Sequence, residues 1–163
     1  MITSGGERII RSDLIRTKLK EIEDSLSLIS ENLPGEVDKF LELGIVKDGI
    51  YKRVEFCIES ALDVCSILNS DLKLGIPSSE DDIIQNLVRK RVISPEMGKK
   101  LKLMKGFRNI LVHRYGKITD ELAFESIASG MDDFRMFIRE VERAIKTCKK
   151  TAQERRTKDD RRS

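Results

Sequence analysis

The sequence predicts an all-α fold, an antiparallel four-helix bundle with one additional short helix. Its composition has 36% charged residues, 5% aromatic residues and no Trp, which is the bias of helical proteins. Apolar residues recur at steps of three and four residues along four long segments, as in amphipathic helices. Pro and Gly breaks separate these segments, which argues against the alternative of one long coiled coil.

The first two long helices are marked by such stripes. The first begins at Ser12 and is stopped by Pro34-Gly35, and its stripe is Ile15, Leu19, Ile22, Leu26, Ile29 and Leu33. The second has the stripe Ile50, Val54, Cys57, Ala61, Val64 and Leu68. A short apolar piece at 37–45 precedes it, and we expect a break near residues 47–49.

Start signals locate the next two helices. Ser78 and Ser79 precede three acidic residues, which predicts a short helix of about Asp81 to Lys90. Ser94-Pro95 predicts the start of a long fourth helix with the stripe Met97, Leu101, Met104 and Leu111. Gly116 is its expected stop.

The last helix is expected to open at Thr119, and its stripe is Ile127, Met131, Phe134, Ile138, Val141 and Ile145. Apolar residues cease after Cys148. We therefore expect one domain over residues 1–148 and a charged, disordered tail over 149–163.

Charge is concentrated in that tail. The net charge is +3, but residues 149–163 hold seven basic and three acidic residues, which leaves 24 basic and 25 acidic residues in the body. The body is therefore not basic overall, and any RNA contact must come from a local patch or from the tail.

The remaining composition excludes several classes of protein. Cys57, Cys65 and Cys148 form no CxxC pair, and a zinc site would need all three together with the single His. We expect reduced core cysteines and neither metal nor cofactor. No segment approaches the roughly 20 apolar residues of a membrane span, and no signal peptide is visible, so a cytoplasmic protein without membrane contact is expected.

Four positions of the fourth helix, Lys102, Gly106, Asn109 and His113, fall on one face because each step is three or four residues. Gly costs about 1 kcal/mol in a helix interior, so Gly106 suggests that a ligand or partner helix needs the space. Arg108 falls in line with apolar Met104 and Leu111 and must reach a partner or an anion. A purely structural alternative is that Arg108 forms a buried salt bridge to Glu59 or Asp63 and that His113 only caps the helix.

The run from Gly106 to Tyr115 resembles the RxxxxHxY signature of HEPN domains, in particular of the HepT-like toxins that are encoded beside a minimal nucleotidyltransferase antitoxin. Similarity extends to about residues 12–145, including the segments 55–68 and 92–104. The resemblance implies a homodimeric, metal-independent endoribonuclease, with Arg108 and His113 as the catalytic pair and Asn109 as their polar neighbour. It also implies RNA as substrate and a nucleotidyltransferase as partner.

That chemistry is plausible from the residues themselves. Cleaving RNA without a metal needs a base for the 2′-OH proton, an acid for the leaving oxygen and a cation over the phosphate. His113 can transfer protons near neutral pH and Arg108 can pair with phosphate oxygens. One His cannot readily serve both ends of the reaction, so we expect a composite site at a two-fold dimer interface.

Tyr115 has two interpretations. It either hydrogen-bonds or packs at the helix end, or it is the residue to which the resemblance implies that the antitoxin transfers AMP, which would block RNA by charge and bulk. Two other functions stay open for the chain: a non-catalytic HEPN module that binds nucleotide or a nucleotidyltransferase, and an unrelated regulatory bundle.

Overall fold

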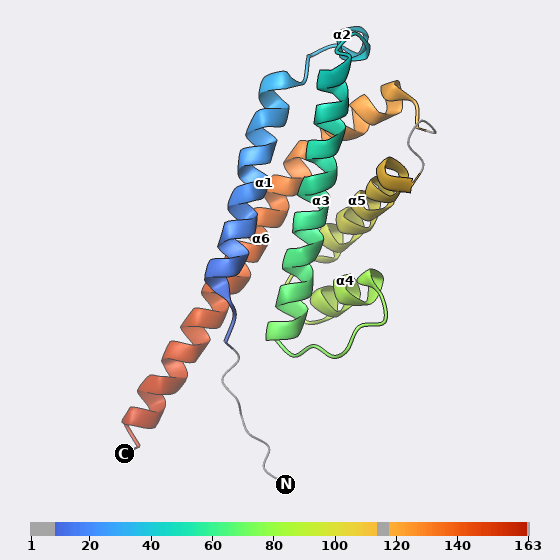
Figure 1. Ribbon diagram of the computed structural model, residues 1–163. Coiled ribbons are helices and arrows are strands. Elements are labelled where there is room, and N and C mark those ends of the chain that lie inside the picture. The colour runs from blue at the N-terminus through green and yellow to red at the C-terminus, as the bar shows by residue number, and fades with distance from the viewer. Residues whose placement is uncertain (1–8, 114–117, 163) are drawn as a thin grey trace.

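The computed structural model describes residues 9–113 and 118–162, and the regular structure in these residues is entirely helical (Figure 1). The all-α prediction is thereby confirmed. The helices are α1 (Ser12–Asn32), α2 (Val37–Leu41), α3 (Ile45–Asp71), α4 (Glu80–Arg89), α5 (Pro95–His113) and α6 (Asp120–Asp160).

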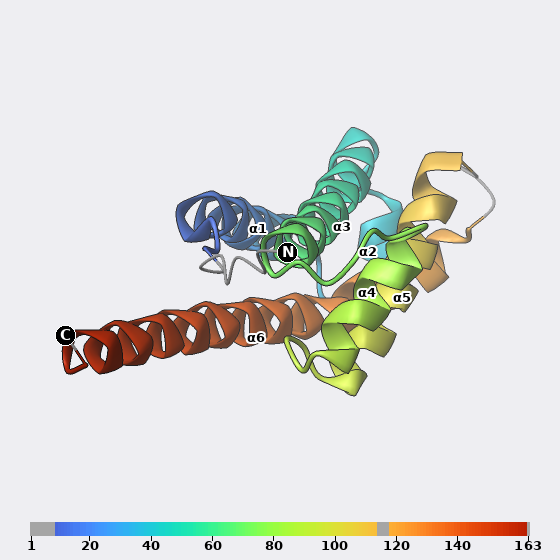
Figure 2. The same ribbon diagram turned by 90° about the horizontal axis from the view of Figure 1, so that it is seen from below.

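Four long helices form the bundle, and two short ones join its ends. α1 and α3 run antiparallel and make the most extensive contact, α3 also packs on α4 and α5, and α6 contacts α1, α2 and α5 (Figures 1 and 2). The sequence predicted one short helix, and α2 is a second. It forms from the apolar piece at 37–45, where Phe40 is fully buried.

The expected break near residues 47–49 is wrong, because α3 already begins at Ile45 and runs through Gly49. The chain turns at Gly44 instead. Gly44 has a φ of 58°, a backbone conformation that residues with a Cβ rarely adopt. A glycine inside a regular helix and a glycine at a turn are therefore not distinguished by residue type alone.

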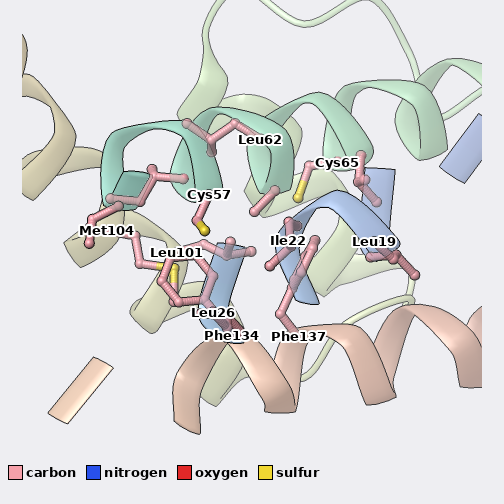
Figure 3. Packing of buried hydrophobic residues seen from close by; sticks show 14 of the residues in the cluster. Leu19, Ile22, Leu26, Cys57, Leu62, Cys65, Leu101, Met104, Phe134 and Phe137 are labelled. Atoms are coloured by element: carbon pink, nitrogen blue, oxygen red, sulfur yellow. The ribbon is translucent and has the colours of Figure 1, made fainter. Parts of the chain in front are cut away.

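The predicted stripes build the core. Figure 3 shows side chains from α1, α3, α5 and α6 meeting in one cluster, among them Ile22, Cys57, Leu101 and Phe134. On α6, Ile138 is only partly buried and the fully buried Phe137 takes core space beside it. The core continues without interruption between the four long helices.

The cysteines lie in or near this core as expected. Cys57 and Cys65 are buried, Cys148 is half-buried, and none of the three forms a disulfide within the described part of the chain. Burial raises the pKa of the Cys57 thiol to about 11 and that of Cys65 to about 12. Both are therefore protonated and unreactive at neutral pH.

The predicted caps of α4 and α5 are present. Ser79 Oγ accepts a hydrogen bond from the Asp82 amide at 3.1 Å, and Ser94 Oγ accepts one from the Met97 amide at 3.1 Å. Ser94 also donates to the buried Glu140 of α6, its amide at 2.5 Å and its hydroxyl at 2.9 Å. The start of α5 is thus fixed both to its own first turn and to α6.

The start of α6 is held by α3. Thr119 caps the helix as predicted, with its Oγ1 accepting from the Leu122 amide at 3.4 Å. Asp120 then accepts hydrogen bonds from Tyr51 at 2.5 Å and from Lys47 at 2.7 Å. These two hydrogen bonds lower the pKa of Asp120. The chain is therefore anchored a few residues after the end of α5.

The tail differs from the expectation of disorder, because α6 continues as a helix to Asp160 (Figures 1 and 2). An existing helix lengthens without a new nucleation step, and Lys, Arg, Glu, Gln and Ala are good helix formers. Lack of apolar residues predicted only that this segment packs on nothing, and its side chains are indeed almost all exposed. A domain boundary at residue 148 stays a prediction.

Within residues 9–113 and 118–162, none of the helices is both long and apolar enough to span a membrane.

Candidate active site

Three motif residues, Arg108, Asn109 and His113, lie on the C-terminal half of α5, and Arg108 is largely enclosed. Its side chain is only 11% exposed, and its guanidinium contacts both α3 and α4. Nη1 donates to Glu59 of α3 at 3.0 Å, and Nη2 donates to Glu80, the first residue of α4, at 2.9 Å. Nη1 also reaches Glu80 at 3.3 Å. Two carboxylates therefore hold the outer edge of the guanidinium.

Asn109 accepts a hydrogen bond from the remaining polar group of the Arg108 side chain. Arg108 Nε donates to Asn109 Oδ1 at 3.2 Å, which brings two of the three predicted catalytic residues into direct contact. Burial by itself disfavours the charged guanidinium, but Glu80 and Glu59 outweigh it and raise the pKa of Arg108. Arg108 is thus a permanent cation in a fixed orientation.

The structural alternative, a salt bridge from Arg108 to Glu59 or Asp63, is correct for the first of these partners, because Arg108 does pair with Glu59. Asp63, the other partner considered, pairs instead with Lys18 at 3.2 Å. Glu80 was recognised in the sequence only as a first-turn acid of α4. Its contact with Arg108 depends on how α4 docks against α5, which a helical stripe does not reveal.

A second ion pair continues this docking. Lys105, one turn before Arg108, donates to Asp81 at 2.7 Å. The acidic first turn of α4 thereby contacts two cationic side chains of α5, Lys105 and Arg108. The helix dipole also stabilises negative charge at this end of α4. α4 also packs closely on α5 at Gly98, where an added Cβ would lie only 2.6 Å from Val88 Cγ2 of α4.

His113 is the last described residue of α5, and it is exposed. It stands five positions after Arg108, which corresponds to roughly 140° around the helix axis and about 7.5 Å along it. Lys102 and Gly106, on the same face as His113, are exposed as well, and the space where a Cβ of Gly106 would lie is open. Three of the four residues on the predicted polar face are therefore accessible in the single chain, and the fourth, Asn109, is half-buried.

An apolar groove with a cavity volume of about 750 Å³ flanks this face between α5 and the first half of α6. Exposed leucines lie on both of its walls: Leu103 of α5 is 75% exposed and Leu122 of α6 is 58% exposed. Val112, on the other side of Asn109, is 45% exposed. Apolar side chains thus surround the motif face and are open to a partner.

Tyr115 and Gly116, the predicted modification target and helix stop, lie outside the described residues. Within the described ranges, no group of three or more His, Cys, Asp or Glu side chains is placed to hold a metal ion. The predicted catalytic residues Arg108, Asn109 and His113 all lie on α5, with the exposed Lys102 on the same face as His113.

Comparison with known proteins gives a consistent family. Residues 22–141 match the family model described as ribonuclease HepT-like. The mRNA nuclease HepT of Shewanella oneidensis is 27% identical over 127 residues, which are 78% of this chain and 95% of that protein. The tRNA nuclease HepT of Aphanizomenon flos-aquae is 24% identical over 88 residues, 54% of this chain and 60% of that protein.

A solved structure agrees with this. The tri-AMPylated HEPN toxin of Shewanella oneidensis, in complex with its MNT antitoxin, is similar with a TM-score of 0.73 and 26% identity, covering 80% of this chain and 97% of that one. The region that matches the family model, residues 22–141, contains all of α3, α4 and α5 with the complete RxxxxH motif. The chain therefore belongs to the HepT-like ribonuclease family.

Proposed function

We propose that this protein is a metal-independent endoribonuclease toxin, paired with a nucleotidyltransferase antitoxin, that cleaves cytoplasmic RNA at a composite site in a homodimer. The observation that carries the proposal is the oriented Arg108–Asn109 pair on the same helix as an accessible His113, in a chain of the HepT-like family. A fixed cation and a proton-transferring imidazole are what metal-free cleavage of RNA requires.

The reaction assigns a role to each residue. An imidazole nitrogen of His113 takes the 2′-OH proton, and the 2′ oxygen attacks the adjacent phosphorus. The P–O5′ bond breaks, a 2′,3′-cyclic phosphate forms, and the departing 5′ oxygen takes a proton from an acid. Arg108 and Asn109 stabilise the extra negative charge on the phosphate oxygens.

A second protomer supplies what one chain lacks. Arg108 and His113 are about 140° apart around α5, so the two side chains of one helix do not converge on one phosphate. A two-fold axis beside the motif face would bring the His113 of each protomer toward the other, giving one base and one acid. The exposed Leu103 and Val112 beside this face support burial in such an interface.

The antitoxin partner is inferred from the family. In the similar Shewanella oneidensis complex the HEPN toxin is tri-AMPylated and bound to an MNT antitoxin. Tyr115, two residues beyond His113, is the phenol of the motif and the residue we assign as the AMP acceptor. AMP there would add negative phosphate beside the cations that RNA needs.

A non-catalytic module is the second candidate function, and one observation favours it. Glu59 and Glu80 already occupy the Nη edge of Arg108, so an RNA phosphate must displace or share these carboxylates. A protein that only binds a nucleotidyltransferase could keep this arrangement permanently. Cleavage assays distinguish the two functions.

The test compares wild type with His113→Ala and with the control Lys39→Gln, a change of an exposed residue on α2. Each protein is incubated with RNA in excess chelator, and products are analysed for 2′,3′-cyclic phosphate ends. We expect cleavage by wild type and control, and a loss of at least about 100-fold in His113→Ala. Activity that needs added magnesium, or equal activity in His113→Ala, would refute the mechanism, and no cleavage by wild type would favour the binding module.

Oligomeric state is measured separately by light scattering at micromolar concentration. We expect a dimer in wild type and dissociation when Leu103 is changed to Glu, because a charge would enter the apolar interface. A wild-type monomer that cleaves RNA would remove the composite site while leaving the nuclease activity in place.

A further inference from the structure

The C-terminal end of α6 carries a concentration of positive charge that the active site does not use. Residues 149–162, here called the C-terminal arm, hold seven basic and three acidic residues. Every side chain of the arm is exposed except Ala152, which is half-buried. The arm projects past the end of the bundle (Figures 1 and 2), and the family match ends at residue 141, before the arm begins.

A cationic stripe leads from the bundle into this arm. Arg139, Arg143, Lys146 and Lys150 are exposed and follow one another at steps of four, three and four residues, so they share one face of α6. None of the four forms a salt bridge with another described residue. Many surface cations of the bundle are by contrast paired, such as Arg16 with Glu142 and Lys20 with Asp24.

The side chains of the arm favour binding to a polyanion. Ala152 is its only apolar residue, so the arm cannot insert an apolar face into a membrane or into a hydrophobic groove of another protein. Exposed Lys and Arg along a helix bind phosphates by releasing condensed counterions, without reading sequence. Residues 1–148 as a whole, with 24 basic and 25 acidic residues, have no net positive charge, so the attraction is concentrated in the stripe and the arm.

We propose that the cationic stripe and the C-terminal arm form a second RNA-binding surface that holds the phosphate backbone of a substrate remote from the cleavage site. This inference rests on the proposed nuclease function. The arm lies 29 residues from Asp120 along α6, which is roughly 43 Å at the rise of an α-helix. At about 3.4 Å per stacked nucleotide, an RNA must extend on the order of 12 nucleotides to reach both places.

The binding test uses a ligand that cannot be cut, so it is independent of cleavage. A fluorescent 30-nucleotide 2′-O-methyl oligouridylate lacks the attacking hydroxyl, and its anisotropy is measured from 0.05 to 0.4 M salt. The test variant, called the arm variant, changes Lys146 of the stripe together with Lys149 and Lys150 of the arm to Gln, which keeps helix propensity. The matched control, Lys39→Gln with Lys73→Gln and Lys90→Gln, removes three exposed charges from the bundle.

We expect the arm variant to bind about 10- to 100-fold more weakly than wild type at 0.1 M salt, with its log–log salt slope smaller by about 2, because each phosphate contact contributes about 0.7. The control should keep the wild-type slope. An arm variant with the same affinity and slope as wild type would overturn the proposal. So would arm-dependent binding to anionic phosphatidylserine vesicles without arm-dependent binding to RNA.

Cleavage of short and long RNA connects the arm to function. We expect the arm variant to cleave a 6-nucleotide RNA at the wild-type rate and a 30-nucleotide RNA with a raised KM. Equal loss on both lengths would mean that the arm acts on the fold or the active site, and would overturn a remote role. If wild type cuts neither RNA, the nuclease function fails, while the salt slope still decides whether the arm binds RNA.

Discussion

Nη2 of Arg108 on α5 lies 2.9 Å from Glu80, the residue that begins α4, and Nη1 of the same guanidinium lies 3.0 Å from Glu59 of α3. One side chain therefore ties three helices together. The same residue is the cation that the proposed reaction needs, so structural and chemical roles coincide at Arg108. Its contribution to each can be separated by measurement.

A double-mutant cycle measures the structural part. We expect Arg108→Met combined with Glu80→Gln to give a coupling energy of about 1 kcal/mol in the free energy of unfolding, because Glu80 is 41% exposed and water screens the pair. The matched cycle of Arg108→Met with Asp63→Asn should give almost none, since Asp63 pairs with Lys18. Equal coupling in both cycles would contradict the observed pairing.

Glu80→Gln also tests whether the carboxylate positions Arg108 or restrains it. If Glu80 fixes the guanidinium for the phosphate, the variant should lose kcat with little change in KM. If it competes with RNA for Arg108, the variant should lower KM instead. Glu59→Gln should move the same parameter as Glu80→Gln, because both carboxylates contact Nη1.

The anchor at the start of α6 makes a pH-dependent contribution to stability. The pKa of Asp120 is lowered from its ordinary 3.8 by the hydrogen bonds from Lys47 and Tyr51. A lowered folded pKa means that the contribution is fully present above about pH 4 and is lost as the pH falls through the folded value. We expect Asp120→Asn to lower the free energy of unfolding by about 1–2 kcal/mol at pH 7.

Denaturant unfolding at several pH values checks this. The difference between wild type and Asp120→Asn should stay constant down to about pH 4 and shrink as the pH falls further to about pH 2, since the two side chains become equally uncharged. Asp38→Asn, an exposed acid of α2, serves as the control and should leave the stability unchanged over the same range. A difference that grows toward low pH would contradict the assignment of the shift to the charged form of Asp120.

Periodicity predicted most of the fold because it reports burial. Each residue of the stripe on α5, from Met97 to Leu111, is buried, and the capping serines stand at the expected helix starts. The start of α3 was missed because whether a glycine turns the chain depends on its backbone conformation, as Gly44 and Gly49 illustrate. The helical tail was missed because exposure does not prevent an existing helix from continuing.

The site was predicted in part for the same reason. Spacing assigned Gly106, Asn109 and His113 to one face of the helix, of which Gly106 and His113 are exposed and Asn109 is half-buried. It also identified Arg108 as a charge on an apolar stripe, together with one of its partners, Glu59. Glu80 could not be assigned because its contact is made across two helices whose docking depends on the shapes of side chains such as Val88 against Gly98.

Tyr115 is expected to be the switch of the protein. Co-expression with its nucleotidyltransferase should add AMP to Tyr115, while Tyr115→Phe should stay toxic in the presence of that enzyme because it lacks the acceptor hydroxyl. The control is Tyr51→Phe, which removes the hydroxyl that buried Tyr51 donates to Asp120 and should not alter neutralisation. Intact mass and peptide mapping provide the measurement, and an unmodified Tyr115 in a neutralised complex would mean that inhibition works by binding.

The two glycines of α5 are expected to respond in opposite ways to the same change. At Gly98 a Cβ would lie 2.6 Å from Val88 Cγ2, and the β-branched valine cannot easily move, so we expect Gly98→Ala to destabilise the protein by about 1–2 kcal/mol. At Gly106 the space is open, so Gly106→Ala should stabilise the helix by about 0.5–1 kcal/mol.

The value of Gly106→Ala lies in combining stability with activity. If a partner helix or RNA approaches α5 closely at this position, the variant should be more stable toward unfolding of the chain yet dimerise more weakly or cleave RNA several-fold more slowly. Chemical denaturation, light scattering and cleavage rates on the same preparation measure the three effects. A variant that is stabilised, fully dimeric and fully active would show that nothing approaches Gly106, and the interface would then have to lie on another side of the motif helix.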